Sequence, residues 1–275
     1  MNRTNIDRFF YIFILMITAI CCSLLFFILY GIISQGYSSI SFTFLTSPSK
    51  DFGTSGGIFY QIIGSLLMVF VASLIALPLS LGTVLCTTEL FPADSSHYFT
   101  RVIIFGLNGI PSIIYGLFGY IFFVDFLKTG ISWFVGSIIL GLMIMPTIMM
   151  SSYHAIQAIP SQYKESAQAL GLNTWQIILS VILPQSLNAT LSGLFLGLAR
   201  TIGETAPVLF IATAFFGGEI PTTLFEPVAS LPTHIFNLAQ QANNPIALSN
   251  AWGSSLVLIS IVMIFSLSSL KIKNL

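Results

Sequence analysis

Long apolar runs constrain this chain more than any other feature of its sequence. The run over residues 9–33 and several later ones reach the roughly 20 residues that a helix needs to cross a bilayer. Only 7% of the residues are charged, whereas a soluble domain carries about 25%. A membrane-spanning β-barrel would instead show short alternating segments. We therefore predict an all-α integral membrane protein with a single transmembrane domain over residues 1–275.

The apolar runs predict six transmembrane helices, separated by segments rich in Gly, Pro and Ser that are typical of loops. The first run is too long for a signal peptide and lacks a small-residue cleavage site, so we expect it to remain as the first span. Glycines recur on the third span, where small residues let membrane helices approach closely. The predicted spans are 9–33, 58–88, 102–126, 131–150, 187–216 and 251–270.

Positive charges in the short loops predict which side faces the cytoplasm. With both termini inside, the outer side holds only two loop cations, Lys50 and Lys128. The cytoplasmic side then holds Arg3, Arg8, Arg101, Lys164, Lys271 and Lys273. We therefore expect both termini in the cytoplasm. The long polar loop over residues 153–186 falls on the same side, where ATP is present.

This polar loop predicts two short helices around a glycine. Ser161 follows a proline at a typical helix start, and Glu165 lies in the early turns, where a carboxylate stabilises the helix dipole. Gly171 is typical of a helix C-terminus. Apolar residues from Trp175 restart a helical face, and Pro184 is expected to open the next element.

The same loop contains a regularly spaced pattern. Its members are Glu165, Ser166, Ala167, Gly171, Val181, Leu183 and Pro184. The spacing resembles the EAA loop of bacterial ABC importer permeases, with Ser in place of the second alanine and Val in place of an isoleucine. This resemblance implies the MetI-like, type I permease fold and a cytoplasmic coupling helix that docks on a separate ATPase. An ordinary loop is the alternative, but it requires no glycine at that spacing.

Two charged residues, Arg200 and Glu204, lie inside the predicted fifth span. Arg200 is about 20 Å from its cytoplasmic end at 1.5 Å per residue, where an arginine costs at least about 2.5 kcal/mol on insertion scales. Glu204 follows four residues later, so on one helix the two share a face and can pair. The pair either fixes helix packing alone, or Arg200 offers its forked donors to an oxyanion while Glu204 holds it. We favour the second interpretation.

The residues around this pair extend the resemblance. Residues 200–207 read RTIGETAP and residues 108–117 read NGIPSIIYGL. Both runs resemble the phosphate-specific ABC permeases, and the terminal Ala-Pro is closer to PstA-type than to PstC-type subunits. The resemblance implies a substrate path that includes Arg200, Thr201, Glu204 and Thr205. It also implies a PstC-like second permease, a PstB-like ATPase dimer that binds ATP and Mg, and a PstS-like extracytoplasmic phosphate-binding protein.

Several other functions are disfavoured by the sequence. A formal net charge of +0 argues against a nucleic-acid partner. The chain has no ATPase phosphate-binding loop and no nucleophile–base constellation, and its three histidines lack metal-ligand spacing. We therefore expect a non-catalytic subunit without a cofactor or metal of its own. Glu89, in a predicted cytoplasmic loop, is expected to be solvated.

Two alternatives remain beside a phosphate-importing permease of the bacterial inner membrane that works by alternating access. One is a permease for another oxyanion, such as molybdate or phosphonate, which the Gly-Glu-Thr-Ala-Pro run disfavours. The other is a self-sufficient secondary transporter. Such transporters often contain inverted repeats with paired broken helices, whereas this sequence shows no convincing repeat, and the polar loop would then have no role.

Overall fold

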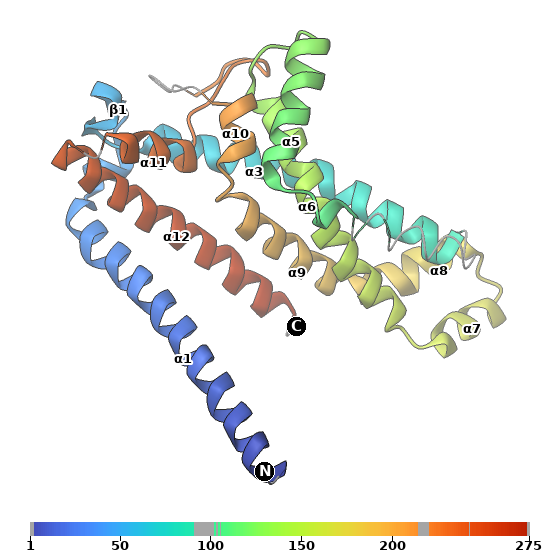
Figure 1. Cartoon of the computed structure of the whole chain (residues 1–275). Coiled ribbons are helices and arrows are strands. Elements are labelled where there is room, and N and C mark those ends of the chain that lie inside the picture. The colour runs from blue at the N-terminus through green and yellow to red at the C-terminus, as the bar shows by residue number, and fades with distance from the viewer. Residues whose placement is uncertain are drawn as a thin grey trace.

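The computed structural model describes residues 3–90, 102, 104, 106–213, 220–241 and 243–273, with the backbone alone for residues 3–9 and 52. This part of the chain is almost entirely helical (Figure 1). Within it, five helical stretches are long and apolar enough to cross a membrane. They contain α1 (Arg3–Gly36), α3 (Phe59–Leu85), α6 (Trp133–Gln157), α9 (Leu183–Thr201) and α12 (Pro245–Lys273).

Short elements connect and cap these helices. One end carries a two-stranded antiparallel hairpin in which Ser49 lies opposite Gly56. The Asn250 side-chain amide donates to the carbonyl oxygens of Gly53 and Thr54 at 2.9 and 3.2 Å, which ties α12 to the hairpin. The elements at this end are η1 (Tyr37–Ser39), α2 (Phe42–Thr46), β1 (Ser49–Lys50), η2 (Asp51–Gly53), β2 (Ser55–Gly56), α10 (Ala206–Ile211) and α11 (Leu231–Gln240).

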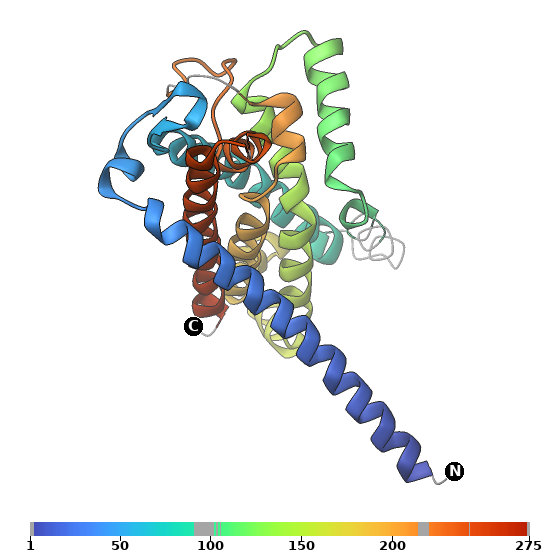
Figure 2. The same cartoon turned by 60° about the vertical axis from the view of Figure 1, so that its left-hand side comes forward.

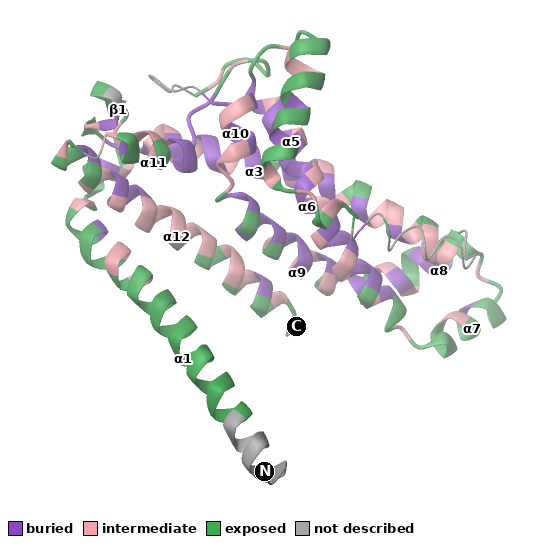
Figure 3. Cartoon of the chain, in the orientation of Figure 1, coloured by how far each residue is buried: buried purple, intermediate pink, exposed green. Residues whose placement is uncertain are grey.

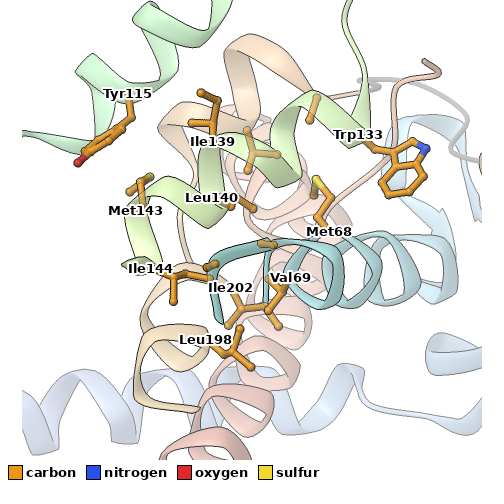
Figure 4. Packing of buried hydrophobic residues seen from close by; sticks show 14 of the residues in the cluster. Met68, Val69, Tyr115, Trp133, Ile139, Leu140, Met143, Ile144, Leu198 and Ile202 are labelled. Atoms are coloured by element: carbon orange, nitrogen blue, oxygen red, sulfur yellow. The ribbon is translucent and has the colours of Figure 1, made fainter. Parts of the chain in front are cut away.

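The core lies where α3, α6 and α9 pack together, and it is the most buried part of the chain (Figure 3). Met68 and Val69 of α3, Leu140 and Ile144 of α6, and Leu198 of α9 meet there (Figure 4). Small residues bring these helices close, because a Cβ at Gly197 would meet the Ile144 side chain at 2.6 Å. Membrane helices gain most from such close packing, since lipid gives them little hydrophobic drive to associate.

Helix α1 packs differently from the other long helices. It leaves the bundle at an angle (Figure 2), and its apolar residues are exposed along most of its length. Within the described part of the chain, its main contacts are with α12 and η1. An apolar helix that the chain itself does not cover requires lipid or another membrane protein around it.

The predicted third span, 102–126, is not one continuous helix. Its described part turns at residues 109–110, and Pro111 has extended backbone angles of φ −57° and ψ 139°. The chain then continues as α5 (Ser112–Gly119) and the wider π-turn segment η4 (Tyr120–Phe126), which together are shorter than the five spanning stretches. Proline disfavours helical geometry in the residue before it, which explains the break.

The predicted fifth span, 187–216, is also wrong as a single helix. Helical structure begins earlier, at Thr174, and ends at Thr201. A turn follows, and the short helix α10 starts at Ala206 with Pro207 in its first turn. Pro207 has no N–H for a helical hydrogen bond, so it suits the first turn of a new helix and favours an interruption before it. Proline alone does not force the break, because α3 and α6 continue through Pro78 and Pro146. Residues 214–216 of the prediction lie outside the described residues.

Both chain ends lie toward the same end of the molecule as the polar segment between α6 and α9. In Figures 1 and 2 the two termini and this segment occupy the lower end, and the hairpin and α11 the upper end. Which of the two ends faces the cytoplasm stays a prediction. Arg101 lies outside the described residues, and so do the side chains of Arg3 and Arg8.

Candidate functional site

Arg200 occupies the last turn of α9 and is exposed. Its Nη1 donates to the side-chain oxygen of Asn108 at 3.4 Å. Asn108 precedes α5, and the buried Tyr115 of α5 donates its hydroxyl to the Leu107 carbonyl at 2.8 Å, which fixes that segment. We call Arg200 and Asn108, with the neighbouring exposed Gly203, the Arg200 site. Sequence reasoning used Asn108 only for family resemblance. The sequence signal that could have pointed to Asn108 is an isolated amide side chain next to a Gly–Pro break.

Glu204 does not pair with Arg200, so the predicted ion pair is wrong. The prediction required one helix through both residues, but α9 ends at Thr201 and the chain turns. The ion pairs among the described residues are Lys128–Asp125 and Lys164–Glu89. Glu204 is half-buried and instead lines a small cavity with Ser65 and Ser230. The cavity offers about 10 Å³ to the centre of a water molecule, which is about the room that one water needs.

The two predicted threonines are less accessible than the arginine. Thr201 is buried and donates its hydroxyl to the Gly197 carbonyl at 2.8 Å, within its own helix. Thr205 is half-buried just before α10, where its carbonyl accepts from the Leu209 N–H at 2.9 Å. Arg200 is therefore the member of the predicted substrate path that is placed to meet a ligand from outside the chain.

The Arg200 site can bind an anion. A guanidinium has five N–H donors in a planar fork that matches oxyanions, and the bond to Asn108 is long and uses one of them. Gly203 leaves room beside it, since even an added Cβ would meet only the Arg200 carbonyl, at 3.8 Å. An arginine within a membrane-spanning helix is expected to face a watery path or a partner subunit rather than lipid. Among the described residues no group of three His, Cys, Asp or Glu could hold a metal ion.

The polar segment between α6 and α9 contains the helix α7 (Ser161–Ala169). The C-terminal end of α7 forms as predicted. Gly171 has φ +81°, a left-handed conformation that glycine adopts without strain. Its N–H donates to the Gln168 carbonyl at 2.9 Å, and the Leu172 N–H donates to the Ala167 carbonyl at 3.2 Å. These two bonds satisfy the last carbonyls of α7 and stop the helix.

The second predicted short helix of this segment is not separate. Helix α8 (Thr174–Ile177) starts with a capping box between Asn173 and Gln176 and continues through the π-turn segment η5 (Ile178–Ile182) into α9. Pro184 was expected to open a new element, but it lies in the first turn of α9. A π-turn accommodates such an interruption of the helical hydrogen bonds without ending the helix. The predicted loop 153–186 therefore shortens to residues 158–173.

The predicted coupling residues lie on different faces. Glu165 and Ser166 are exposed on α7, whereas Ala167 is buried. Leu183 is half-buried and Pro184 exposed, both within the long helix rather than on α7. Ala167 belongs to an apolar cluster that attaches α7 to the bundle; its other buried members are Val84, Ile104, Met149, Tyr153, Ile156, Ile177, Ile178 and Ile182.

An ion pair that sequence reasoning missed also attaches α7. Lys164 Nζ donates to Glu89 Oε1 at 2.6 Å, and the two side chains are 28% and 10% exposed. The expectation that Glu89 is solvated is therefore wrong. Glu89 lies in the π-turn segment η3 (Cys86–Leu90), which extends α3. No local pattern reveals a contact between residues 75 positions apart.

The chain is similar to one protein family and to several individual proteins, and these similarities agree with one another. Residues 92–273 match the family described as binding-protein-dependent transport system inner membrane component. The chain is 30% identical over 265 residues to the probable ABC transporter permease protein YqgI of Bacillus subtilis, covering 91% of this chain and 90% of that protein. It is 31% identical over 241 residues to the phosphate transport system permease protein PstA of Xylella fastidiosa, covering 86% and 82%.

Two further comparisons bear on subunit type and fold. The chain is 31% identical over 269 residues to the phosphate transport system permease protein PstC of Pasteurella multocida, covering 86% of this chain and 80% of that protein. It also superposes on a chain of a bacterial ABC transporter involved in the import of the acidic polysaccharide alginate. That match has a TM-score of 0.66 and 17% identity over 98% of both chains, and it shows a shared fold.

Proposed function

The chain belongs to the family of binding-protein-dependent transport system inner membrane components, and from this premise we propose that it imports inorganic phosphate. It is a PstA-like ABC permease, a non-catalytic multi-pass subunit of the inner membrane. The phosphate substrate is the proposal. Relatives named as phosphate permeases support it over most of the chain.

The observation that carries the proposal is the exposure of Arg200 at the broken end of α9. A buried arginine would only stabilise packing, whereas an exposed one in an apolar chain meets water, a partner or an anion. Its forked donors suit the tetrahedral oxygens of phosphate. One arginine neutralises only part of a phosphate dianion, so we expect a PstC-like permease to supply a second cation across the subunit interface.

The proposed mechanism is alternating access driven by a separate ATPase. A PstS-like binding protein releases phosphate at the outer end, near the hairpin and α11. A PstB-like ATPase dimer, which binds ATP and Mg, engages the exposed face of α7 that carries Glu165 and Ser166. Closure of the ATPase moves α7, the helices rock, and the anion passes Arg200 to the cytoplasm. Both termini and α7 are cytoplasmic in this scheme.

The test is ATP-dependent uptake of radiolabelled phosphate by proteoliposomes that contain the chain, its PstC-like and PstB-like partners and the loaded binding protein. Arg200→Ala should lower uptake at least tenfold while complex assembly and ATP hydrolysis persist. Lys128→Ala is the matched control, since it removes an exposed cation whose partner is Asp125. Unchanged uptake by Arg200→Ala would overturn the path assignment. If the wild type took up molybdate in preference to phosphate, the assignment of phosphate as the substrate would be wrong.

A further inference from the structure

The ion pair between Lys164 and Glu89 lies between the two parts of the chain that transport must connect. Lys164 is in the first turns of α7, the helix proposed to engage the ATPase. Glu89 extends α3, one of the three helices of the core. Their side chains meet at 2.6 Å with little exposure to solvent. Charge-assisted hydrogen bonds of this kind are short, strong and directional.

We propose that this ion pair is the link through which movement of α7 displaces α3, so that Lys164 and Glu89 act as positioning residues for transport. The inference rests on the proposed function, because it takes α7 as the ATPase-facing helix. It adds a second attachment beside Ala167, whose side chain is a single methyl group in an apolar cluster. Apolar contacts can slide as helices shift, whereas a partly buried ion pair resists separation because each charge would lose its counter-charge.

Helix α3 can carry such a displacement to the Arg200 site. From its end near Glu89 it packs along α6 through the core. Ser65, Met68 and Val69, toward its other end, line the small cavity that Thr201 and Glu204 also line. That cavity lies directly behind the turn that follows Arg200. Helix α3 is continuous from Phe59 to Leu85, with Pro78 inside it, and η3 extends it to Glu89. In this proposal a shift at Glu89 therefore passes along one unbroken helical element to the cavity.

The junction between α3 and Glu89 is reinforced locally. The Thr88 hydroxyl donates to the Val84 carbonyl at 2.9 Å, and the Thr87 hydroxyl donates to the Val84 and Thr83 carbonyls at 3.0 Å. These bonds hold the π-turn segment to the end of α3. Val84 is itself buried in the cluster that contains Ala167. The ion pair and the apolar cluster therefore act on the same end of α3.

The first readout reports movement and does not depend on the substrate. A cysteine is placed at Gly203 beside Arg200, with Cys21, Cys22 and Cys86 replaced by serine, in the complex with its partner permease and ATPase. Maleimide labelling is compared with and without ATP and vanadate, which traps the closed ATPase. The otherwise wild-type background should show a nucleotide-dependent change of at least threefold. Lys164→Ala and Glu89→Ala should each reduce this change to less than 1.5-fold.

The second readout is the amount of phosphate transported per ATP hydrolysed. Each single variant should lower this ratio at least fivefold while ATP hydrolysis stays within twofold of wild type. The charge-swapped double variant Lys164→Glu/Glu89→Lys should recover at least half of the ratio and of the labelling change. Lys128→Ala, which breaks the exposed pair with Asp125, is the matched control and should leave both readouts unchanged.

The outcomes separate this inference from the proposed function. A labelling change that persists in both single variants, or a charge swap that restores nothing, overturns the link even if phosphate is transported. Reduced assembly with an unchanged ratio would also overturn it, because the pair would then only stabilise the fold. If the Gly203→Cys complex shows the labelling change but the wild-type complex moves no phosphate, the proposed substrate is contradicted and the link stays supported by the labelling data.

Discussion

At the scale of single residues, the position of Arg200 depends on where its helix stops. Had α9 continued, Glu204 would lie one turn above Arg200 and neutralise it. The turn after Thr201 instead directs Glu204 toward Ser65 and Ser230. Among the described residues, the side-chain hydrogen bond of Arg200 is the long one to the neutral Asn108. An amide positions the guanidinium without cancelling its charge. The positive charge therefore remains available to an anion.

Asn108 gives a direct test of this argument. Asn108→Asp places a carboxylate beside Arg200, so the two should form an ion pair that competes with phosphate. We expect Asn108→Asp to lower the rate of phosphate uptake at least tenfold, and Asn108→Ala, which adds no charge, to lower it less than threefold. Uptake in proteoliposomes at subsaturating phosphate, where competition for Arg200 lowers the rate, measures both. Equal effects of the two substitutions would contradict the role of the free charge.

Two glycines on one helix test how closely α3 is packed. At Gly64 an added Cβ would clash with the Ala229 carbonyl oxygen and lie 2.7 Å from the Val228 side chain, whereas at Gly82 nothing lies within 4 Å. Overpacking costs about 1–3 kcal/mol, and alanine is about 1 kcal/mol better than glycine within a helix. Gly64→Ala should lower the thermal unfolding midpoint in detergent, and Gly82→Ala should keep or raise it. A similar shift for both would exclude close packing as the cause.

At the scale of elements, hydropathy located the long helices well but could not place their ends. Apolar residues flank the breaks at Gly109–Pro111 and Gly203–Pro207, so hydropathy averaged over a long window stays high across both. Proline favours a break there because it lacks the N–H of a helical hydrogen bond. However, α3 and α6 continue through Pro78 and Pro146, so a proline alone does not locate a helix end. The end of α7 was predictable, since Gly171 signals a helix terminus locally. The pairing of Lys164 with Glu89 was not, because it depends on how distant elements pack.

Helix α11 provides a prediction about pH. Burial lowers the pKa of His234 to about 4, and its Nδ1 lies 3.5 Å from the Gln61 side-chain nitrogen. Above about pH 6.5 the ring is neutral in the folded and unfolded chain alike. As the pH falls from 6.5 toward 4, the unfolded chain binds the proton first, so the folded state loses stability, by about 2 kcal/mol at pH 5.

His234→Gln removes this titration and keeps a polar side chain. Hydrogen exchange of α11 at pH 7.5 and pH 5, corrected for the intrinsic exchange rate, should show protection falling in the wild type. In His234→Gln the protection should fall less. A loss of protection that is the same in both proteins would show that another group is responsible.

At the scale of the whole molecule, the chain leaves much apolar surface for other molecules to cover. Most of α1 and one face of α5 are exposed, including Phe26, Phe27, Ile113, Leu117 and Phe118. The exposed Arg200 side chain lies near α5. A partner permease against that face would therefore also enclose the proposed anion path. We therefore expect the chain to pair with a second permease, and we expect the packed core of α3, α6 and α9 to be the stable part of the chain in that assembly.

The proposed function also predicts which end of the molecule meets the ATPase. The proposed function requires α7 inside and the hairpin outside, as the distribution of Lys and Arg in the loops also predicts. Lys50 of the hairpin and Gln168 of α7 are both exposed, so each can be replaced by cysteine in a chain whose native cysteines are serine. A membrane-impermeant maleimide added to spheroplasts should label Lys50→Cys at once. It should label Gln168→Cys only after permeabilisation. Because the two positions lie at opposite ends of one bundle, the reverse pattern would place α7 outside the cell, beyond the reach of any cytoplasmic ATPase.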